Sequence, residues 1–409
     1  MFARIVSSFK NNYIEYSLYF LIASLFFGSA ILSIANTIFY VIVLFNIYKK
    51  IRFYEYFEIK PFLFLNLYFL VIFLILCFLS ENINQVLEIE KYLPFILYPL
   101  FFFTNREELN KKDTINCVRK ILVFGATITF FASFCYSLWR MFFLEENINP
   151  IYITYSFLTD LFGVHLIYLS AFYLLAIMFC LDFYYQKQYQ ISNKKYLFIS
   201  AFLFFALILL SSRTALIASF FVIFTKIIIL NKKNIKRIIL IMFSIIFLGS
   251  VLIFCIPILK ERVVNINKNV SSYSGISLRI KIWENAIEVF KKSPIYGYGI
   301  SNSQDVLLNQ YHQVNFRRAF LKNFNAHNQY LQSLIDSGVI GLIFLILMLM
   351  SPILFFRNKT NFILFTILIL ITLIPESFLI RQNGIIFYCL FFCIFAIDNS
   401  DSKRSKKLI

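Results

Sequence analysis

The sequence predicts an all-α integral membrane protein of about twelve transmembrane helices with one large outer loop. Three observations lead to this prediction. Of the 409 residues, 60% are hydrophobic, and the mean hydropathy is +0.75, whereas soluble domains are nearer half apolar. The apolar residues form long runs, and a helix needs about 20 of them to cross a bilayer. In addition, basic residues gather in alternate connections between these runs.

The apolar runs give the positions of the predicted helices. They cover residues 16–31, 34–48, 61–79, 92–104, 117–139, 160–182, 196–211, 214–230, 237–257, 338–356, 361–379 and 383–398. Two regions, 16–48 and 196–230, fit either a tight hairpin or one long helix, because the two look alike in hydropathy. The predicted organisation is a membrane bundle of nine spans (1–257), a large outer loop (258–328), three further spans (329–398) and a basic tail (399–409).

The net charge of +18 is interpreted as a signal of orientation. With the N-terminus in the cytoplasm, most of the 39 Lys and Arg residues fall on the cytoplasmic side, where the C-terminus also lies. The short outer connections hold only Lys91, Arg140, Arg213 and Arg381, which agrees with the positive-inside rule. Because the charges are scattered over short connections, the sequence argues against nucleic-acid binding.

The seven cysteines predict neither a metal site nor a disulfide framework. They lie in or beside apolar runs, and no two of them form a Cys-x-x-Cys pair. Cysteines in such runs are interpreted as packing residues. No group of histidine and acidic residues has the spacing of metal ligands, so we expect neither a metal ion nor a cofactor.

Arg213 interrupts the apolar region 196–230, in the stretch "SSRTAL". A charged side chain at membrane depth costs about 2.5–3.5 kcal/mol on insertion scales. In one interpretation, Ser211, Ser212 and Thr214 form a turn and Arg213 extends to the interface. In the other, Arg213 binds an anion at the outer surface of the membrane.

A second arginine, Arg279, lies in the stretch "SLRIKIWENAIEVFKKSP" of the large loop. Ser277 can cap a helix here and Pro294 ends it, which predicts a helix over about 278–292. A helical wheel puts Arg279 at the centre of the buried stripe, close to Trp283. A buried cation needs a partner. The candidates are an internal salt bridge, stacking on Trp283, or a substrate phosphate, for which a guanidinium is well suited.

His327 precedes a long apolar run, in the stretch "FNAHNQYLQSLIDSGVIGL". Asn325 can cap a helix that starts near Ala326, which would put His327 in its first turn. The positive end of the helix dipole disfavours a charged imidazole, and a neutral imidazole can accept a proton from a hydroxyl. Asn328 is a polar neighbour that could orient this hydroxyl. The alternative is a hydrogen-bonded structural histidine at a membrane interface.

The predicted topology puts Arg213, Arg279 and His327 at the outer surface, and we expect them to converge in one pocket. Two cations can hold a diphosphate and stabilise the charge that it gains as a leaving group, while a base removes a proton from an attacking hydroxyl. A lipid-linked sugar diphosphate is a membrane substrate that needs both. A transporter of lipid-linked glycan is an alternative, but transporters often show two similar halves and interrupted mid-membrane helices, and the sequence predicts neither.

Taken together, "SSRTAL", "SLRIKIWENAIEVFKKSPIYGYG" and "NAHNQYLQSLIDSGVIGL" resemble the O-antigen ligase and O-antigen polymerase superfamily of bacterial cell-envelope glycosyltransferases, over about residues 196–345. The resemblance implies a C-type glycosyltransferase-like fold. It also implies a metal-independent, inverting transfer of a glycan from undecaprenyl diphosphate, at the periplasmic face of the bacterial inner membrane. The acceptor would be lipid A-core in a ligase, which is our leading interpretation, or another lipid-linked glycan in an O-antigen or exopolysaccharide polymerase.

The resemblance further implies roles for individual residues. Arg213 and Arg279 would bind the diphosphate, and His327 would be the base. Arg262, in "ILKERV", would be a further phosphate or acceptor contact. Trp283 and Asn328 are candidate substrate-binding residues, and no cofactor is implied. The partners would be the lipid-linked donor, the acceptor and membrane lipid, with no nucleic acid.

Overall fold

The computed structural model describes residues 2–50, 59–80, 83–143, 154–185, 194–210, 212–230, 243, 275–355 and 360–404. Within these ranges the regular elements are all helices, and no strand occurs. The chain divides into two compact units. Unit 1 comprises Met1–Tyr48 and Asn105–Ile266, and unit 2 comprises Lys49–Thr104 and Asn267–Ile409. Each unit thus combines segments that lie far apart in the sequence.

The composition of the helices makes this a membrane protein. Four described helices are long and apolar enough to cross a bilayer, namely Lys60–Leu79, Lys112–Phe143, Leu166–Tyr185 and Gln329–Phe355. Shorter apolar helices cover Ser29–Phe45, Pro94–Thr104, Thr214–Leu230, Thr360–Thr372 and Gln382–Asp398. The predicted ninth span, 237–257, lies outside the described residues except for Phe243. The count of about twelve spans therefore stays a prediction.

Unit 1 is built around a helix that is apolar on all sides. Its elements are α1 (Phe2–Ser24), α2 (Ser29–Lys50), α7 (Arg106–Leu109), α8 (Lys112–Phe143), η3 (Tyr155–Thr159), α9 (Leu166–Tyr185), α10 (Lys194–Leu209) and α11 (Arg213–Leu230). Helix α9 packs against α8, α10 and α11, and almost every residue of it is buried, as expected for a helix without a polar face. Turns separate α1 from α2 and α10 from α11, so both ambiguous regions are pairs of helices.

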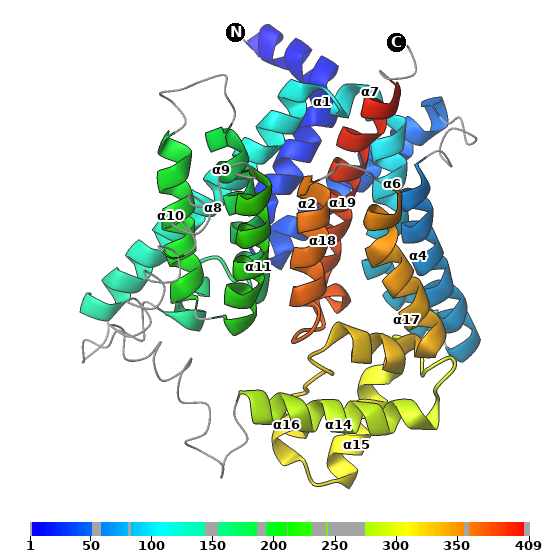
Figure 1. Cartoon of the computed structure of the whole chain (residues 1–409). Helices are drawn as coiled ribbons and strands as arrows, with labels where there is room; N and C mark the ends of the chain where they lie inside the picture. Colours follow the sequence, from blue (N-terminus) through cyan, green and yellow to red (C-terminus); the bar gives the residue numbers. More distant parts are fainter. Residues whose placement is uncertain are drawn as a thin grey trace. The chain divides into compact units, whose positions relative to one another are not determined.

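Unit 2 combines helices from Lys49–Thr104 with helices from Asn267–Ile409. Its elements are α4 (Lys60–Leu79), α5 (Ile83–Leu87), η1 (Glu88–Tyr92), α6 (Pro94–Thr104), α14 (Ile276–Lys292), α15 (Ser303–Gln313), α16 (Arg317–Leu321), α17 (Gln329–Phe355), α18 (Thr360–Thr372), η4 (Phe378–Ile380) and α19 (Gln382–Arg404). Helix α17 packs along α4, and α19 packs along α6. Figure 1 shows α14 running across the end of this bundle, together with α15 and α16.

Three connections that were predicted to be outer meet at one end of unit 2. Gln85, between α4 and α6, donates a hydrogen bond from Nε2 to Oδ1 of Asn302 in the large loop, at 2.8 Å. The N–H of Gln329 donates to the main-chain oxygen of Leu373 at 2.9 Å, which joins the start of α17 to the connection after α18. Such a meeting is what one shared side of the membrane requires.

The described part of the large loop is mostly helical. The predicted helix 278–292 is observed as α14. The rest of the predicted loop, however, was assigned no helix, and it contains α15 and α16. These helices and the start of α17 enclose a small apolar core, formed by Ile282, Ala286, Val289, Leu307, Tyr311, Phe316, Ala319, Ala326 and Ile335. Burial of these side chains fixes α14 in place beneath the site described below.

Helix α17 is interrupted at Ser337 and Gly338, where the predicted span 338–356 begins. Gly338 has φ 62° and ψ −162°, a conformation that is essentially restricted to glycine. A Cβ atom here would also overlap the main-chain oxygen of Ile295. The break was hidden in the sequence because Gly338 lies at the start of an apolar run.

The segment between α14 and α15 packs directly onto this break. The N–H groups of Tyr298 and Gly299 donate to the main-chain oxygens of Ile335 and Asp336, each at 2.9 Å, and the N–H of Val339 donates to Pro294 O at 2.9 Å. These bonds satisfy groups that the interrupted helix would otherwise leave unpaired. The "SPIYGYG" segment therefore joins α14 to α17 through main-chain contacts.

Candidate active site

One carboxylate oxygen lies between an arginine and a histidine at the end of unit 2. Oε2 of Glu376 is 3.3 Å from Nδ1 of His327 and 3.9 Å from Nη2 of Arg279. The first distance is at the outer limit of hydrogen bonding, whereas the second is an ion pair without a hydrogen bond. The side chain of Glu376 is 10% exposed, against 25% for His327 and 32% for Arg279. The carboxylate is therefore buried behind two groups that solvent and a ligand can reach.

This arrangement determines what the imidazole can do. An ionised Glu376 can only accept hydrogen bonds, so its contact favours the tautomer of His327 with the proton on Nδ1. The other nitrogen, Nε2, then carries a lone pair. A carboxylate behind the ring also stabilises the imidazolium that forms when Nε2 takes up a proton. The pair thus has the chemistry of a general base.

The connection that carries Glu376 is held by the start of α17. The N–H of Asn328 donates to Oγ of Ser377 at 3.2 Å, and Oε1 of Gln329 accepts from the N–H of Leu379 at 2.7 Å. Both contacts follow Glu376 in the sequence, and the bond from the N–H of Gln329 to the main-chain oxygen of Leu373 precedes it. The carboxylate is therefore positioned by the main chain around it and by the residues that follow His327.

The start of α17 differs from the prediction. The helix begins at Gln329, and Oδ1 of Asn328 accepts from the N–H groups of Tyr330 (2.9 Å) and Leu331 (3.1 Å), which makes Asn328 the N-cap. The predicted cap, Asn325, instead accepts from the N–H of His327 at 2.9 Å. His327 therefore lies before the helix and not in its first turn.

His327 is held in a left-handed conformation, with φ 45°. This conformation is uncommon for a residue other than glycine. Nε1 of Trp283 donates to the main-chain oxygen of His327 at 3.3 Å, and Oε1 of Gln332 accepts from the N–H of Ala326 at 3.1 Å. Trp283 thus supports the histidine from α14. Because Oδ1 of Asn328 is used in the cap, Nδ2 is the part of that side chain that could meet a substrate.

The environment of Arg279 also corrects the prediction. Helix α14 begins at Ile276, with Gly275 and not Ser277 in the capping position. The buried stripe runs through Ile282, Ala286 and Val289, so Arg279 lies at its edge and not at its centre. From this edge it reaches Glu376. The internal salt bridge that was considered for Arg279 is therefore present, although its length leaves it weak as a hydrogen bond.

Tyr298, the second tyrosine of the "YGYG" segment, also holds α14 in place. The hydroxyl of Tyr298 donates to the main-chain oxygen of Val289 at 3.1 Å. Burial raises the pKa of Tyr298, so the hydroxyl keeps its proton and remains a donor at neutral pH. This contact fixes the C-terminal half of the helix that carries Arg279.

The contacts of Arg279, His327 and Glu376 do not test the binding roles predicted for Arg213 and Arg262. Arg213 is the first residue of α11 in unit 1, and Oγ of the preceding Ser212 accepts from the N–H of Ala215 at 3.3 Å, as an N-cap does. Arg262 lies outside the described residues. The structure thus brings Arg279 and His327 together, whereas the convergence of Arg213 with them stays a prediction.

Glu376 is the functional candidate that the sequence analysis missed. It was placed inside the predicted span 361–379, but α18 ends at Thr372, and Glu376 lies in the connection that follows. The signal was present, because Glu376 is the only acidic residue between positions 337 and 397. An ionisable residue in such an apolar region is by default a candidate for function.

The described residues contain no group of three or more His, Cys, Asp or Glu side chains that could hold a metal ion. The candidate site itself offers one carboxylate, one imidazole and one guanidinium. A guanidinium carries a permanent positive charge and has no lone pair to donate. The set is therefore better suited to an anion and a proton than to a metal ion.

Comparison with known proteins adds two findings. Residues 198–346 match a family model described as O-antigen ligase. A protein of Haemophilus influenzae, described as uncharacterized, is 27% identical over 141 residues, which cover 32% of this chain and 35% of that protein. The chain thus matches about a third of that relative's length. The family match runs from α10 through α14 to the interrupted part of α17, and it includes Arg279 and His327.

Proposed function

Because the chain belongs to the O-antigen ligase superfamily through residues 198–346, we propose that it is a membrane glycosyltransferase of lipopolysaccharide biosynthesis. It moves a glycan from undecaprenyl diphosphate to an acceptor hydroxyl. The acceptor is lipid A-core, as in an O-antigen ligase. The main observation that supports the proposal is that Arg279 and His327 both approach the same carboxylate oxygen of Glu376.

The reaction uses each of these side chains. Nε2 of His327 removes the proton from the acceptor hydroxyl, and the oxygen attacks the anomeric carbon of the donor sugar. A new glycosidic C–O bond forms as the bond from that carbon to the diphosphate breaks, which inverts the configuration. Arg279 stabilises the negative charge that develops on the departing diphosphate. Glu376 stabilises the imidazolium until the proton leaves.

The diphosphate needs more positive charge than Arg279 supplies. Glu376 lies 3.9 Å from Arg279 and offsets much of its charge. Binding of a ligand with at least two negative charges therefore requires further cations. Arg213 and Arg262 fill this role in the proposal, which requires that they approach Arg279 when the donor is bound.

The proposed setting is the bacterial inner membrane, with both termini in the cytoplasm and the site on the periplasmic side. The distribution of basic residues supports this orientation. The meeting of three predicted outer connections at one end of unit 2 supports it as well. A periplasmic reporter enzyme fused after Gln313 is expected to be active, and a fusion that is active only in the cytoplasm would reverse the orientation.

A polymerase of lipid-linked repeat units, for O-antigen or exopolysaccharide, is the second candidate. It uses the same donor and differs in the acceptor, so Arg279, Glu376 and His327 serve it equally well. A transporter of lipid-linked glycan is a third and less favoured candidate, because it needs no general base. The three functions differ in which product is lost when the protein is absent.

The test is deletion of the gene followed by gel analysis of lipopolysaccharide and of carrier-linked glycan. A ligase is expected to leave lipid A-core without glycan, while long carrier-linked glycan accumulates. Core that bears a single repeat unit would instead indicate a polymerase. Unchanged lipopolysaccharide would contradict both the ligase and the O-antigen polymerase, and loss of another polysaccharide would then indicate an exopolysaccharide polymerase. In the purified system, a chelator is expected to leave transfer unchanged, and inhibition would show that a metal ion takes part.

A further inference from the structure

A buried carboxylate and a buried amide lie one helical turn apart near the start of α17, and neither takes part in the mechanism proposed above. Asp336 is 6% exposed and Gln332 is 4% exposed. Nε2 of Gln332 donates to Oδ1 of Asp336 at 2.9 Å. Burial of a carboxylate is costly, and an ionisable residue kept within an apolar bundle is a candidate for a functional role.

The other end of the Gln332 side chain holds the main chain just before the candidate base. Oε1 of Gln332 accepts from the N–H of Ala326 at 3.1 Å. Ala326 is fully buried, so this N–H has no access to water, and loss of its acceptor would be costly. Because a main-chain N–H can only donate, Oε1 must face Ala326 and Nε2 must face Asp336.

Asp336 keeps the amide in this orientation. If the amide were reversed, Nε2 would face the N–H of Ala326 and Oε1 would face the carboxylate, so two donors and two acceptors would oppose each other. An asparagine at position 336 would tolerate either orientation, because its own amide can turn as well. The carboxylate therefore supplies a preference that a neutral residue of the same shape lacks.

The orientation of the amide matters because the segment around His327 is strained. His327 has φ 45°, a conformation that persists only where the surrounding contacts impose it. Gln332 holds the N–H of Ala326 on one side of this residue, and Nε1 of Trp283 holds the main-chain oxygen of His327. Loss of either contact would let the main chain relax and turn the imidazole away from Glu376.

Asp336 is itself fixed by elements that surround the site. The N–H of Gly299 donates to its main-chain oxygen at 2.9 Å, and the hydroxyl of Ser303, at the start of α15, lies beside its carboxylate. The segment with Gly299 follows α14, the helix that carries Arg279. A continuous set of contacts thus runs from α14 through Asp336 and Gln332 to the candidate base.

We propose that Asp336 and Gln332 are a pair of positioning residues for His327. The carboxylate orients the amide, and the amide holds Ala326, so that the imidazole stays directed at the acceptor hydroxyl. The inference rests on the proposed function, in which His327 is the general base. Neither residue of the pair touches the substrate, so the pair should act on kcat and leave the KM for the donor unchanged.

The first test measures glycan transfer by variants of the purified full-length chain in detergent. Gln332→Met has a similar shape but neither contact, and kcat is expected to fall about tenfold or more, since small displacements of a reacting group are costly. Asp336→Asn permits both orientations of the amide and should lower kcat less. Combining Asp336→Asn with Gln332→Glu lets the new carboxylate accept from both Ala326 and position 336, which should restore kcat. Wild-type kcat in Gln332→Met, or a double variant below Asp336→Asn, would overturn the proposal.

A second readout does not depend on catalysis. The chain has two tryptophans, and Nε1 of Trp283 donates to the main-chain oxygen of His327 at 3.3 Å. With Trp139 replaced by Phe in every variant, the indole proton resonance in NMR reports this hydrogen bond alone. The resonance should shift in Gln332→Met and return towards its wild-type position in the double variant. A resonance that is the same in all variants would overturn the proposal.

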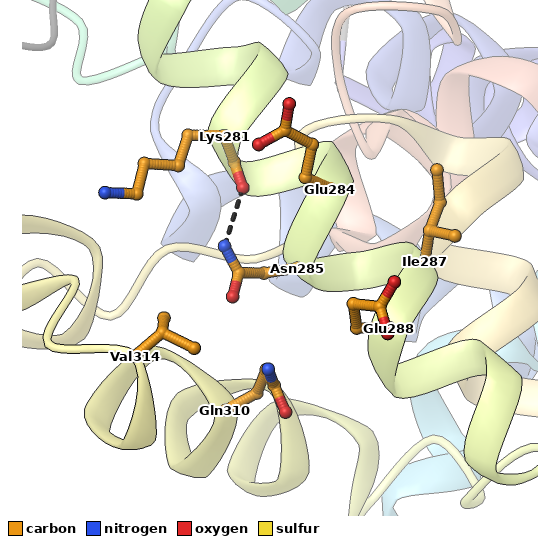
Figure 2. Close-up of a pocket in the computed structure, with 7 residues that line it drawn as sticks. All are labelled: Lys281, Glu284, Asn285, Ile287, Glu288, Gln310 and Val314. Atoms are coloured by element: carbon orange, nitrogen blue, oxygen red, sulfur yellow. Dashed lines mark hydrogen bonds between the residues drawn. The ribbon is translucent and has the colours of Figure 1, made fainter.

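Asn285 provides a matched control, because it is a second buried amide in the same unit. Its Nδ2 donates to the main-chain oxygen of Lys281 at 2.8 Å within α14, and Figure 2 shows the side chain directed toward Gln310. Asn285→Leu removes this amide without changing the contacts of His327, so kcat and the indole resonance should persist even if the melting temperature decreases. An equal fall of kcat in Asn285→Leu and Gln332→Met would show general destabilisation and overturn the proposal.

The two readouts separate the inference from the proposed function. If the wild-type chain transfers no glycan but the indole resonance follows the expected pattern, the proposed function fails while the pair still positions His327. If transfer occurs and kcat is insensitive to Gln332→Met, the proposed function stands and the positioning role fails.

Discussion

Nδ1 of His327 lies 3.3 Å from Oε2 of Glu376, although 49 residues separate the two in the chain. Main-chain and side-chain contacts at Asn328 and Gln329 bring them together. The same carboxylate oxygen is 3.9 Å from Nη2 of Arg279. The pairing is compatible with a catalytic histidine and also with a structural one, and the variants below separate these roles.

The first prediction concerns the histidine itself. His327→Ala is expected to lower the transfer rate by about 10²–10⁴-fold, the usual contribution of a general base, while donor binding persists because Arg279 remains. Initial rates and donor binding of the purified chain measure both effects. His312→Ala, at an exposed position of α15, is the control and should keep its rate. Near-normal turnover of His327→Ala would show that His327 is not the general base.

The second prediction concerns the carboxylate. Glu376→Gln preserves shape but removes the charge behind the imidazole, and kcat is expected to fall by between about 10-fold and 10⁴-fold. The KM for the donor should stay the same or decrease, because a negative charge near the diphosphate is gone. Glu376→Asp should recover part of kcat. If Glu376→Gln lowers the melting temperature but leaves kcat intact, the contact is structural only.

The third prediction concerns Arg279. A lysine ammonium cannot make the forked contact of a guanidinium with two phosphate oxygens, so Arg279→Lys should bind the donor at least tenfold more weakly, as measured by KM. Lys291→Arg, on the exposed side of the same helix, exchanges the residue types in the opposite direction and should have no effect. Equal KM values for Arg279→Lys and the wild type would show that Arg279 pairs with Glu376 but does not bind the donor diphosphate.

The fourth prediction concerns the break in α17. Gly338→Ala forces a side chain into a glycine-only conformation, which costs about 1–3 kcal/mol, and into overlap with Ile295. Both the melting temperature and the transfer rate should decrease. Gly163 also has a positive φ, but a Cβ atom added at Gly163 would meet no atom within 4 Å. Gly163→Ala should therefore destabilise less, and an equal loss in both variants would exclude the close contact as the cause.

Local patterns predicted the helices well. The predicted helix 278–292 is observed as α14 at Ile276–Lys292, because its charge pattern and its terminating Pro294 are local signals. The predicted span 361–379 was too long, because "TLIPESF" continues the apolar run beyond Thr372, where the helix ends. The interruption at Gly338 was missed for the same reason, since hydropathy does not report backbone conformation.

The candidate site was predictable only in part. Arg279 and His327 were identified from residue type and position, and the structure places both on Glu376. Their common partner could not be assigned, because the contact depends on how the connection after α18 folds back onto the start of α17. The N-cap was assigned to Asn325 instead of Asn328, since both asparagines can cap a helix and the tertiary contacts of Ser377 favour the second.

The junction between α14 and α17 depends on main-chain bonds from Pro294, Tyr298 and Gly299. The side chains of Ile295 and Tyr296, within this segment, are 56% and 58% exposed and take no part in those bonds. Evolution is thus free to exchange these two side chains to suit the surrounding lipid or glycan, while the spacing between the arginine and the histidine is preserved. Diversity at the surface and constancy of the reacting groups can coexist in this way within a few consecutive residues.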